Sequence, residues 1–186
     1  MRKTLTILAV LLGMASMAFA QHNQNITLPE KPKNRAQYVD YSMLRSGYWC
    51  AVQLGGFYGS GFAAQADFVN GYRFSEWIKV GAGVSYDYNF RGFSTLPVYV
   101  DVRGNIISQE DTMFAIWWSA DAGYSVGLDP ENKGGVYFSP GIGIRQGGIR
   151  HNFILSLNYM MQGQSFEDTS RNQLLHFVGL KLGYEF

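Results

Sequence analysis

The sequence predicts an all-β fold, an eight-stranded antiparallel up-and-down transmembrane β-barrel, and three observations support this prediction. Aromatic side chains are abundant, with 13 Phe, 12 Tyr and 4 Trp in 186 residues. Charged residues make up only 16% of the chain, against the usual ~25% of globular domains. Eight segments in which apolar and polar residues alternate follow one another, and no run after the N-terminal region is apolar enough for a transmembrane helix.

The N-terminal 20 residues have the pattern of a secretory signal peptide. Arg2 and Lys3 precede an apolar run over residues 5–15, and Ala18-Phe19-Ala20 fits the cleavage site. Removing Arg2 and Lys3 from the 15 basic residues leaves 13 against 14 acidic ones, a net charge of −1. A balance this close to neutral argues against nucleic acid as a partner.

The remaining chain is predicted to consist of two parts. Residues 21–44 are polar and contain two prolines, so we expect a periplasmic N-terminal arm without a packed core. Residues 45–186 are predicted to form the barrel. The predicted strands cover residues 47–57, 61–73, 77–88, 96–104, 113–126, 135–146, 151–162 and 174–186. Most reach the ~9–11 residues that a tilted strand needs to cross a bilayer.

An even number of strands returns the chain to the side of the membrane from which it started. With the N-terminus in the periplasm, four connections are predicted to face outside, at 58–60, 89–95, 127–134 and 163–173. Three are predicted to face the periplasm, at 74–76, 105–112 and 147–150.

Each predicted strand has one apolar face and one face with charged and small residues. In the last strand, Leu180 and Leu182 alternate with Lys181 and Gly183. Across all strands the second face carries five basic and five acidic residues, predicted to form an ion-pair network: Asp67, Arg73, Lys79, Asp87, Asp101, Arg103, Asp121, Arg145, Lys181 and Glu185.

The glycines decide which face points inward. Nearly all mid-strand glycines share the charged face; Gly56 is the exception. A solvent-exposed face has no need for missing side chains, whereas the interior of a narrow eight-stranded barrel must combine small residues with large ones. We therefore expect the charged face inside and the apolar face against lipid. The inner face also carries the large aromatics Trp49, Phe57, Tyr99, Trp117, Tyr137 and Phe177, which predict a packed lumen without a continuous pore.

These features together resemble the small outer-membrane β-barrel proteins of Gram-negative bacteria, the OmpA/OmpX-like group. The resemblance rests on the signal peptide, the eight strands, PVYVDVRGNI at 97–106, YFSPGIGIR at 137–145 and the terminal LKLGYEF. It implies an outer-membrane location, contact with outer-membrane lipid and lipopolysaccharide, and a monomer. It also implies an assembly signal that the barrel-assembly machinery reads during biogenesis, formed by Leu180, Leu182, Tyr184 and Phe186.

Candidate catalytic and metal-binding residues are few. Some barrels of this size are lipid A deacylases with a His and a Ser near the outer rim, and His176 begins the last strand there. No Ser lies two residues after His176, and Ser165 and Ser170 fall in a predicted loop, so no catalytic residue is predicted. The segment 129–134 lacks the distal Glu of a calcium loop.

Three other features are interpreted structurally. Asp101 with Arg103 is assigned to the ion-pair network and not to acid catalysis. The single cysteine, Cys50, is interpreted as a small apolar residue within a strand. The glycines of segment 141–147 do not match a nucleotide-binding motif, and no cofactor is predicted.

The predicted function is that of an integral outer-membrane protein without enzymatic activity. Its lumen is packed and polar, and it serves envelope integrity or surface interaction through its outer loops, foremost 127–134 and 163–173. Two alternatives remain open. One is a lipid A-modifying enzyme of the deacylase type. The other is a secreted, lipocalin-like carrier, which would require the apolar face to point inward.

Overall fold

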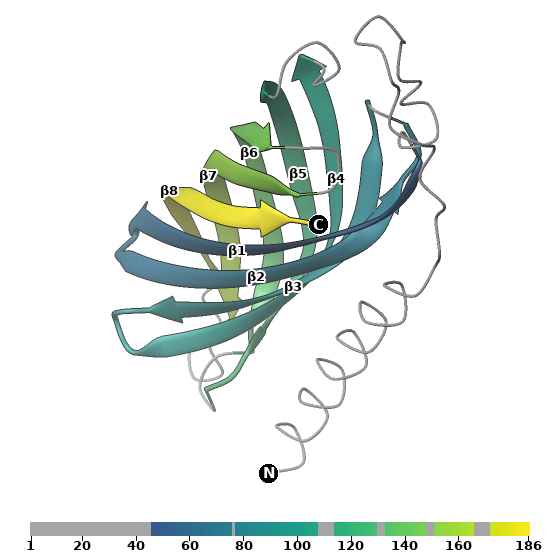
Figure 1. Cartoon of the computed structure of the whole chain (residues 1–186). Helices are drawn as coiled ribbons and strands as arrows, with labels where there is room; N and C mark the ends of the chain where they lie inside the picture. The colour runs from purple at the N-terminus through teal and green to yellow at the C-terminus, as the bar shows by residue number, and fades with distance from the viewer. Residues whose placement is uncertain (1–45, 76, 108–113, 130–132, 148–150, 166–171) are drawn as a thin grey trace, which may run out of the picture. The chain divides into compact units, whose positions relative to one another are not determined.

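The barrel predicted from the sequence is confirmed by a computed structural model. It describes residues 46–75, 77–107, 114–129, 133–147, 151–165 and 172–186, which form one closed antiparallel sheet with consecutive strands as neighbours (Figure 1). The strands are β1 (Gly47–Gly59), β2 (Phe62–Arg73), β3 (Lys79–Asn89), β4 (Phe93–Ile107), β5 (Phe114–Gly127), β6 (Gly135–Gly147), β7 (Asn152–Ser165) and β8 (Asn172–Glu185). The predicted signal peptide and N-terminal arm lie outside the described residues.

The pairing register fixes the width of the barrel. Followed once around the sheet, the ladder runs through Gly47, Arg73, Lys79, Arg103, Ser119, Gly141, Asn158 and Gly179 and returns to β1 at Phe57. The chain therefore re-enters β1 ten residues beyond Gly47. With a rise of ~3.3 Å per residue and strands ~4.8 Å apart, this shift corresponds to a strand tilt of about 40° and a backbone radius of about 8 Å.

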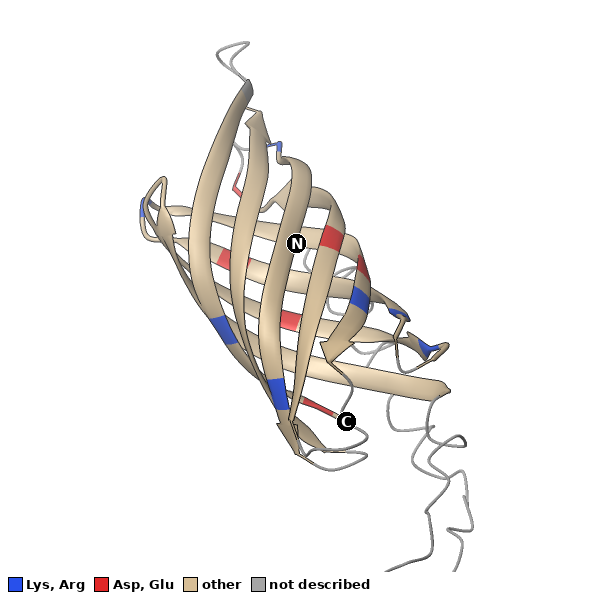
Figure 2. Cartoon of the chain, turned by 90° about the horizontal axis from the view of Figure 1, so that it is seen from above, with Lys and Arg blue, Asp and Glu red and all other residues tan. Residues whose placement is uncertain are grey.

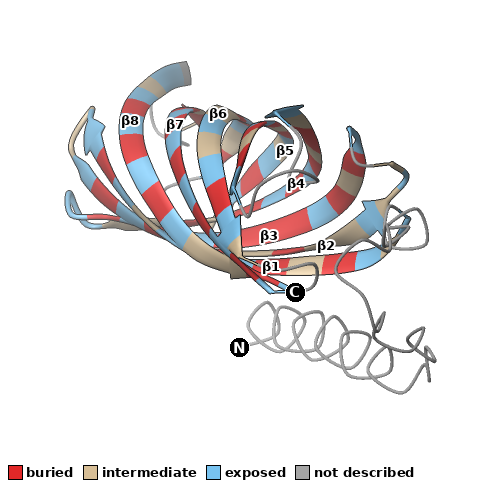
Figure 3. Cartoon of the chain, turned by 45° about the horizontal axis from the view of Figure 1, so that its top comes forward, coloured by how far each residue is buried: buried red, intermediate tan, exposed pale blue. Residues whose placement is uncertain are grey.

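Burial alternates along every strand (Figure 3). Asp101 is 0% exposed, whereas Val100 beside it is 53% exposed; Lys181 is 2% exposed between Leu180 and Leu182, at 57% and 61%. A water-soluble β-protein would show the reverse pattern. The predicted orientation is therefore confirmed: ionic and glycine residues point to the axis, and apolar side chains form the outer wall.

Three outer-face residues of the described strands depart from this alternation: Gly104, Gly163 and, with the largest side chain, Val84. Val84 is only 6% exposed, although both neighbours of its parity, Ala82 and Tyr86, are exposed. It does not belong to the apolar cluster inside the barrel. Its ladder partners are Phe68 and Val98, and directly paired side chains on one face of a sheet lie against each other. Val84 is thus flanked on the outer wall by Phe68 and Val98, which limits its exposure.

The outer wall has an aliphatic middle between two zones rich in aromatic residues. We name the two ends of the barrel by their connections: the C-terminal rim, at 74–78, 108–113 and 148–151, and the loop rim, at 60–61, 90–92, 128–134 and 166–171. Edge-to-face or tilted aromatic pairs occur at both, with Tyr48–Tyr72 and Tyr184–Phe186 near the C-terminal rim and Tyr58–Phe62 and Tyr88–Phe90 near the loop rim. Two aromatic girdles around an apolar band are typical of barrels that cross a membrane.

The pairing of the strands is interrupted at two prolines and at one bulge. Pro97 is unpaired on its β3 side and Pro140 on its β7 side, because proline has no N–H to donate. Near the C-terminal rim, Asn105 pairs with Trp117 and Ile107 with Ile116, so Ile106 is an extra residue in β4. Such bulges are common at the rims of barrels.

The connections at the loop rim are shorter than predicted. The connection expected at 89–95 occupies only 90–92, where Gly92, with φ +98°, closes a turn by donating its N–H to the Asn89 carbonyl. The loop expected at 163–173 spans 166–171, and Ser165, expected in that loop, is the last residue of β7. The predicted strands are too short here because an apolar pattern marks only part of them, whereas the end of β7 and the start of β8 carry polar residues.

The inner glycines make a prediction about stability. A Cβ atom at Gly83 would overlap the ring of Tyr99, whereas a Cβ at Gly56, on the lipid-facing wall, would meet nothing within 4 Å. We expect Gly83→Val to destabilise the barrel by at least ~1–3 kcal/mol through overpacking. Gly56→Val should be neutral or slightly stabilising, because branched residues suit a strand. Urea unfolding in detergent micelles measures both, and equal losses would contradict the inside-out assignment.

Candidate functional site: the ionic lumen

The lumen holds all ten of the charged residues predicted to face inward. Nine of them are buried, with exposed fractions of 0–4%, and Arg73, at the C-terminal rim, is half-buried. Figure 2 marks charged positions part-way along the strands as well as at the rims. Burying a charge is tolerated only when it is paired and hydrogen-bonded, so the contacts of these side chains decide what the lumen can do.

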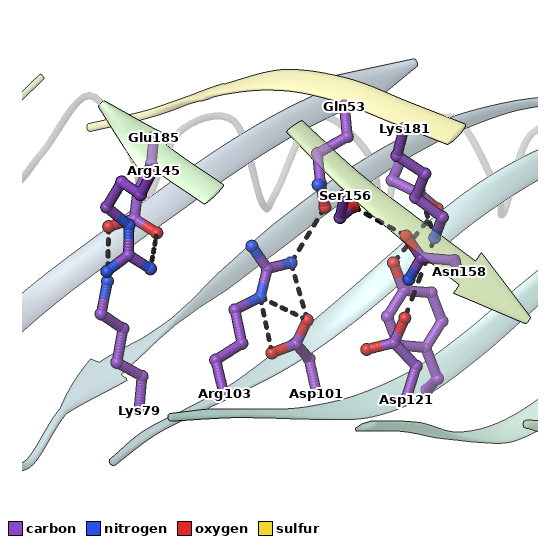
Figure 4. Close-up of polar contacts among 12 residues, drawn as sticks. Gln53, Lys79, Asp101, Arg103, Asp121, Arg145, Ser156, Asn158, Lys181 and Glu185 are labelled. Carbon is purple, nitrogen blue, oxygen red and sulfur yellow. Dashed lines mark hydrogen bonds and ion pairs between the residues drawn. The ribbon is translucent and has the colours of Figure 1, made fainter. Parts of the chain in front are cut away.

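Glu185 is the shared partner of three basic residues at the C-terminal rim. Its Oε1 lies 2.5 Å from Lys79 Nζ and 3.2 Å from Arg73 Nη2, and its Oε2 lies 3.2 Å from Arg145 Nη2. Arg145 also donates to Asn105 Oδ1 at 3.0 Å. One carboxylate on β8 therefore connects β2, β3 and β6, and β4 through Arg145. Figure 4 shows Glu185 with two of these partners, Lys79 and Arg145.

Arg103 lies deeper in the lumen, between two indole rings. Its Nε donates to both carboxylate oxygens of Asp101, at 2.9 and 2.8 Å, and its Nη2 donates to Gln53 Oε1 at 3.0 Å. The guanidinium carbon is 4.8 Å from the ring centroid of Trp49 and 5.1 Å from that of Trp117. Cation–π contacts of this kind strengthen when they are removed from water. The group fills the centre of the barrel with side chains from β1, β4 and β5.

A third group surrounds Lys181 further toward the loop rim. Its Nζ lies 2.8 Å from Asp67 Oδ2 and 3.9 Å from Asp121 Oδ2. The Tyr99 hydroxyl donates to the other oxygen of Asp67 at 3.2 Å, and the Tyr99 ring lies 5.3 Å from that of Tyr137. Lys181 therefore links β8 with β2 and β5 across the axis.

The half of the lumen nearest the loop rim contains mostly neutral polar side chains. Gln65 Nε2 lies within hydrogen-bonding distance of Tyr137 Oη, at 3.0 Å, and of Ser85 Oγ, at 3.3 Å. Gln162 Nε2 lies 2.6 Å from Thr95 Oγ1 and 2.7 Å from Ser125 Oγ. The charged residue in this region is Asp87, which is 3.5 Å from Gln162 Nε2.

Sequence reasoning missed part of this network. The predicted strand 151–162 ends at Gln162, and Gln164 falls in the predicted loop, although both side chains are buried at 2–3% exposure. Both residues continue the two-residue period that runs through Ser156 and Asn158, so this period, extended past the last apolar residue, places them on the inner face. The partners of Glu185 were not predictable from spacing, because they depend on the register around the whole barrel.

The candidate catalytic residue His176 lies on the outer wall near the loop rim and is exposed. Its Nδ1 is 2.6 Å from the hydroxyl of Tyr159. The hydroxyl of Ser60 accepts the backbone N–H of His176 at 3.1 Å and donates to its carbonyl at 3.3 Å. The described residues thus pair this imidazole with a tyrosine, and the nearby serine bonds the histidine backbone.

The remaining candidates are placed as follows. In the described part of the chain, no group of three or more His, Cys, Asp or Glu side chains could hold a metal ion, and no helix is long and apolar enough to cross a membrane.

Asp129, from the segment compared with a calcium loop, accepts the backbone N–H of Ser94 at 2.7 Å; residues 130–132 lie outside the described residues. Cys50 is partly exposed on β1 and exchanges two backbone hydrogen bonds with Phe186.

The Glu185 group makes a prediction about stability. In Glu185→Gln, three cations lose their shared counter-charge, and removing one partner of a buried ion pair costs about 3–5 kcal/mol. Lys79→Met is the matched control, because Glu185 keeps two arginines and the residue volume is nearly preserved. We expect the control to cost clearly less, measured by urea unfolding followed by Trp fluorescence. Equal costs would show that Glu185 is not the centre of the group.

Comparison with known proteins agrees with this geometry at the level of the fold. No protein-family model matches the chain, and no curated protein matches its sequence. Among solved structures, the Neisserial surface protein A is similar, with a TM-score of 0.54, 8% identity, and coverage of 75% of this chain and 97% of that one. Two further similarities have TM-scores below 0.5. The N-terminal β-barrel domain of Pseudomonas aeruginosa OprF scores 0.46, with 11% identity over 74% of this chain and 97% of that one.

The outer membrane protein OprG from Pseudomonas aeruginosa scores 0.47, with 10% identity over 76% of this chain and 97% of that one. At such low identities the comparison concerns the fold alone. The resemblance drawn from the sequence is confirmed to that extent: this chain has the eight-stranded fold of the small outer-membrane β-barrel proteins.

Proposed function

We propose that the protein is an integral, non-enzymatic component of the Gram-negative outer membrane. Its barrel acts as a solid anchor, and its role is in envelope integrity or in surface contacts made at the loop rim. The observation that carries the proposal is the combination of an apolar outer wall with a lumen closed by ion pairs. The first requires hydrocarbon as its surroundings, and the second leaves little room for a substrate or a permeant solute.

The dimensions support a membrane anchor. The strands contain 11–15 residues, which at a tilt of about 40° extend roughly 28–38 Å along the barrel axis. The hydrocarbon core of a bilayer is about 30 Å thick. The two aromatic girdles then lie near the two interfaces, where Tyr and Trp favour one apolar and one hydrated side.

The width supports a closed lumen. Side chains from opposite walls meet at the axis when the backbone radius is only about 8 Å. The stacked layers of Glu185, Arg103 and Lys181, each with partners from other strands, occupy successive heights. A steady ionic current would require several of these buried pairs to separate.

A catalytic role at His176 is less well supported. Acyl hydrolysis needs a hydroxyl nucleophile within hydrogen-bonding reach of the imidazole and a third group that orients it. Here Tyr159 bonds the imidazole, and Ser60 bonds the backbone of His176. A Tyr–His pair on the outer wall near a rim suits an interfacial position, where amphipathic side chains are favoured.

The lipocalin-like carrier is contradicted by the burial pattern. That alternative requires the apolar face inside, whereas Val98 and Leu180 are more than half exposed and Asp101, Arg103 and Lys181 are buried. The alternation of apolar and polar residues alone is compatible with this alternative, because it does not distinguish the inside of a barrel from the outside.

The assembly signal remains a proposal with a structural rationale. Leu180, Leu182 and Phe186 are at least half exposed on the outer wall, so a second protein could contact them before lipid does. The same segment forms the seam of the barrel, since β8 pairs with β1 from Gly59 to Ala51. We propose that the barrel-assembly machinery recognises this strand, and that the mature monomer then contacts lipid and lipopolysaccharide.

At the loop rim, the surface proposed for external contacts includes the described residues of 128–134 and the ends of β7 and β8. Leu128 donates its N–H to the Ser94 carbonyl, and Asp129 accepts from Ser94. These bonds tie the β5–β6 connection to the start of β4. Such a connection is fixed at its base, which suits a binding loop on a rigid scaffold.

Expression in a Gram-negative host tests location and activity together. The protein should fractionate with the outer membrane and migrate differently in gels before and after heating, because folded barrels resist denaturation by detergent. Lipid A from the same cells should keep its acylation pattern. Recovery as a soluble periplasmic monomer would exclude the membrane anchor. Altered lipid A acylation that disappears in His176→Ala would establish the enzymatic alternative.

Planar-bilayer recording tests the closed lumen. The folded wild-type barrel should show no large steady conductance, because the ion-paired layers block the axis. A matched variant, Gly56→Val, changes only the lipid-facing wall and should behave as the wild type does. Stable, voltage-independent openings of the wild type at moderate salt would contradict the proposal that the barrel is solid.

A further inference from the structure

Asp87 is the exception among the ten charged residues of the lumen. The other nine each have an oppositely charged atom within 4.0 Å in the described residues. Asp87 has none there, although it is only 4% exposed. A buried carboxylate that lacks a counter-charge is strongly unfavourable in a medium of low polarity. Either a proton or a bound cation must therefore neutralise this carboxylate.

The neighbours of Asp87 supply oxygen atoms. On the inner face, Gln65 of β2 and Thr95 of β4 are its direct ladder partners, with exposed fractions of 3% and 1%. Directly paired side chains have Cβ atoms about 4.5–5.5 Å apart. The three side chains therefore form a row across β2, β3 and β4, in the half of the lumen nearest the loop rim.

Two of these oxygens are left without a partner. Gln65 Oε1 and Asp87 Oδ1 are buried and accept no hydrogen bond within the described part of the chain. Both are acceptors, so neither can satisfy the other. Thr95 Oγ1, the third oxygen of the row, is 2.6 Å from Gln162 Nε2. A positively charged species placed against the row would satisfy both orphaned acceptors and neutralise the carboxylate.

We propose that Gln65, Asp87 and Thr95 form a binding site for a small monovalent cation such as Na⁺. The donor set is all oxygen, which suits hard cations. It carries one negative charge, which matches a single positive charge and is too little for the carboxylate-rich sites that hold Ca²⁺. The cation enters from the loop rim and stays, because Lys181 and then the basic group around Glu185 bar the way along the axis.

The site makes the barrel a cation binder without making it a channel. It is independent of the proposed role in envelope integrity or surface contact, and it holds whether or not the loops have a partner. A ligand that binds only the folded state raises the unfolding midpoint according to its concentration relative to its dissociation constant. Cation binding can therefore be tested by measuring the unfolding midpoint in different salts.

The test compares Na⁺ with the bulky cation N-methyl-D-glucamine at equal ionic strength and neutral pH. The refolded full-length barrel in zwitterionic detergent should unfold at a midpoint several degrees higher in Na⁺. Asp87→Asn, which is nearly isosteric and removes the unpaired charge, should lose this difference while remaining at least as stable as the wild type in N-methyl-D-glucamine. Asp129→Asn removes a carboxylate near the same rim and should keep the difference.

Sodium NMR on the wild type complements the unfolding test, because it does not depend on stability. The ²³Na NMR signal should broaden in the presence of the folded wild type, and added K⁺ should reverse the broadening; unfolded protein should not broaden it. The proposal is overturned if the midpoint is the same in both cations, or if Asp87→Asn retains the difference. It is also overturned if the midpoint follows pH alone, since a proton would then neutralise Asp87.

Discussion

The shift of ten residues on one circuit of eight strands is the constraint on which the rest of the structure depends. It sets the tilt, and the tilt sets a backbone radius of about 8 Å. Inside such a cylinder, long side chains from opposite walls must share the same space. A glycine is therefore needed where a large side chain lies over the neighbouring strand, as Tyr99 lies over its ladder partner Gly83. The same narrowness brings Glu185 within reach of basic residues on three other strands, so that charges far apart in the sequence neutralise one another.

The charges cancel overall but not locally. At the C-terminal rim three basic residues share one carboxylate, which leaves two net positive charges; in the centre Asp101 and Arg103 balance. Toward the loop rim Lys181 faces two aspartates, and Asp87 adds another negative charge. The lumen therefore has a positive end and a negative end, separated by a neutral layer. Anions are repelled at one end and cations at the other, so the arrangement opposes passage of either sign even where side chains fluctuate.

Much of this followed from the sequence, and the limits have a physical origin. Two-residue alternation assigned Val100 and Asp101 to opposite faces, because side chains in a strand must alternate. The bias of glycine toward the charged face then identified the inside, which alternation could not. Contacts across the barrel could not be predicted from alternation. Lys79 contacts Glu185 because the pairing registers around the barrel place the two residues at the same height. The bulge at Ile106 and the polar end of β7 were missed for a related reason, since backbone pairing maintains them without an apolar signal.

The outer wall and the lumen leave different possibilities for recognition. The wall offers aliphatic side chains and two aromatic girdles, which suit lipid in general and no ligand in particular. In the described lumen the ion-paired layers near the C-terminal rim and the centre leave buried donor groups without a hydrogen-bond partner, among them Arg103 Nη1, Arg145 Nε and the indole N–H groups of Trp49 and Trp117. The half nearest the loop rim differs, because Asp87 has no counter-charge and Gln65 keeps an unused acceptor. The features on which both binding proposals rest therefore lie toward the loop rim, inside the barrel and at the connections above it.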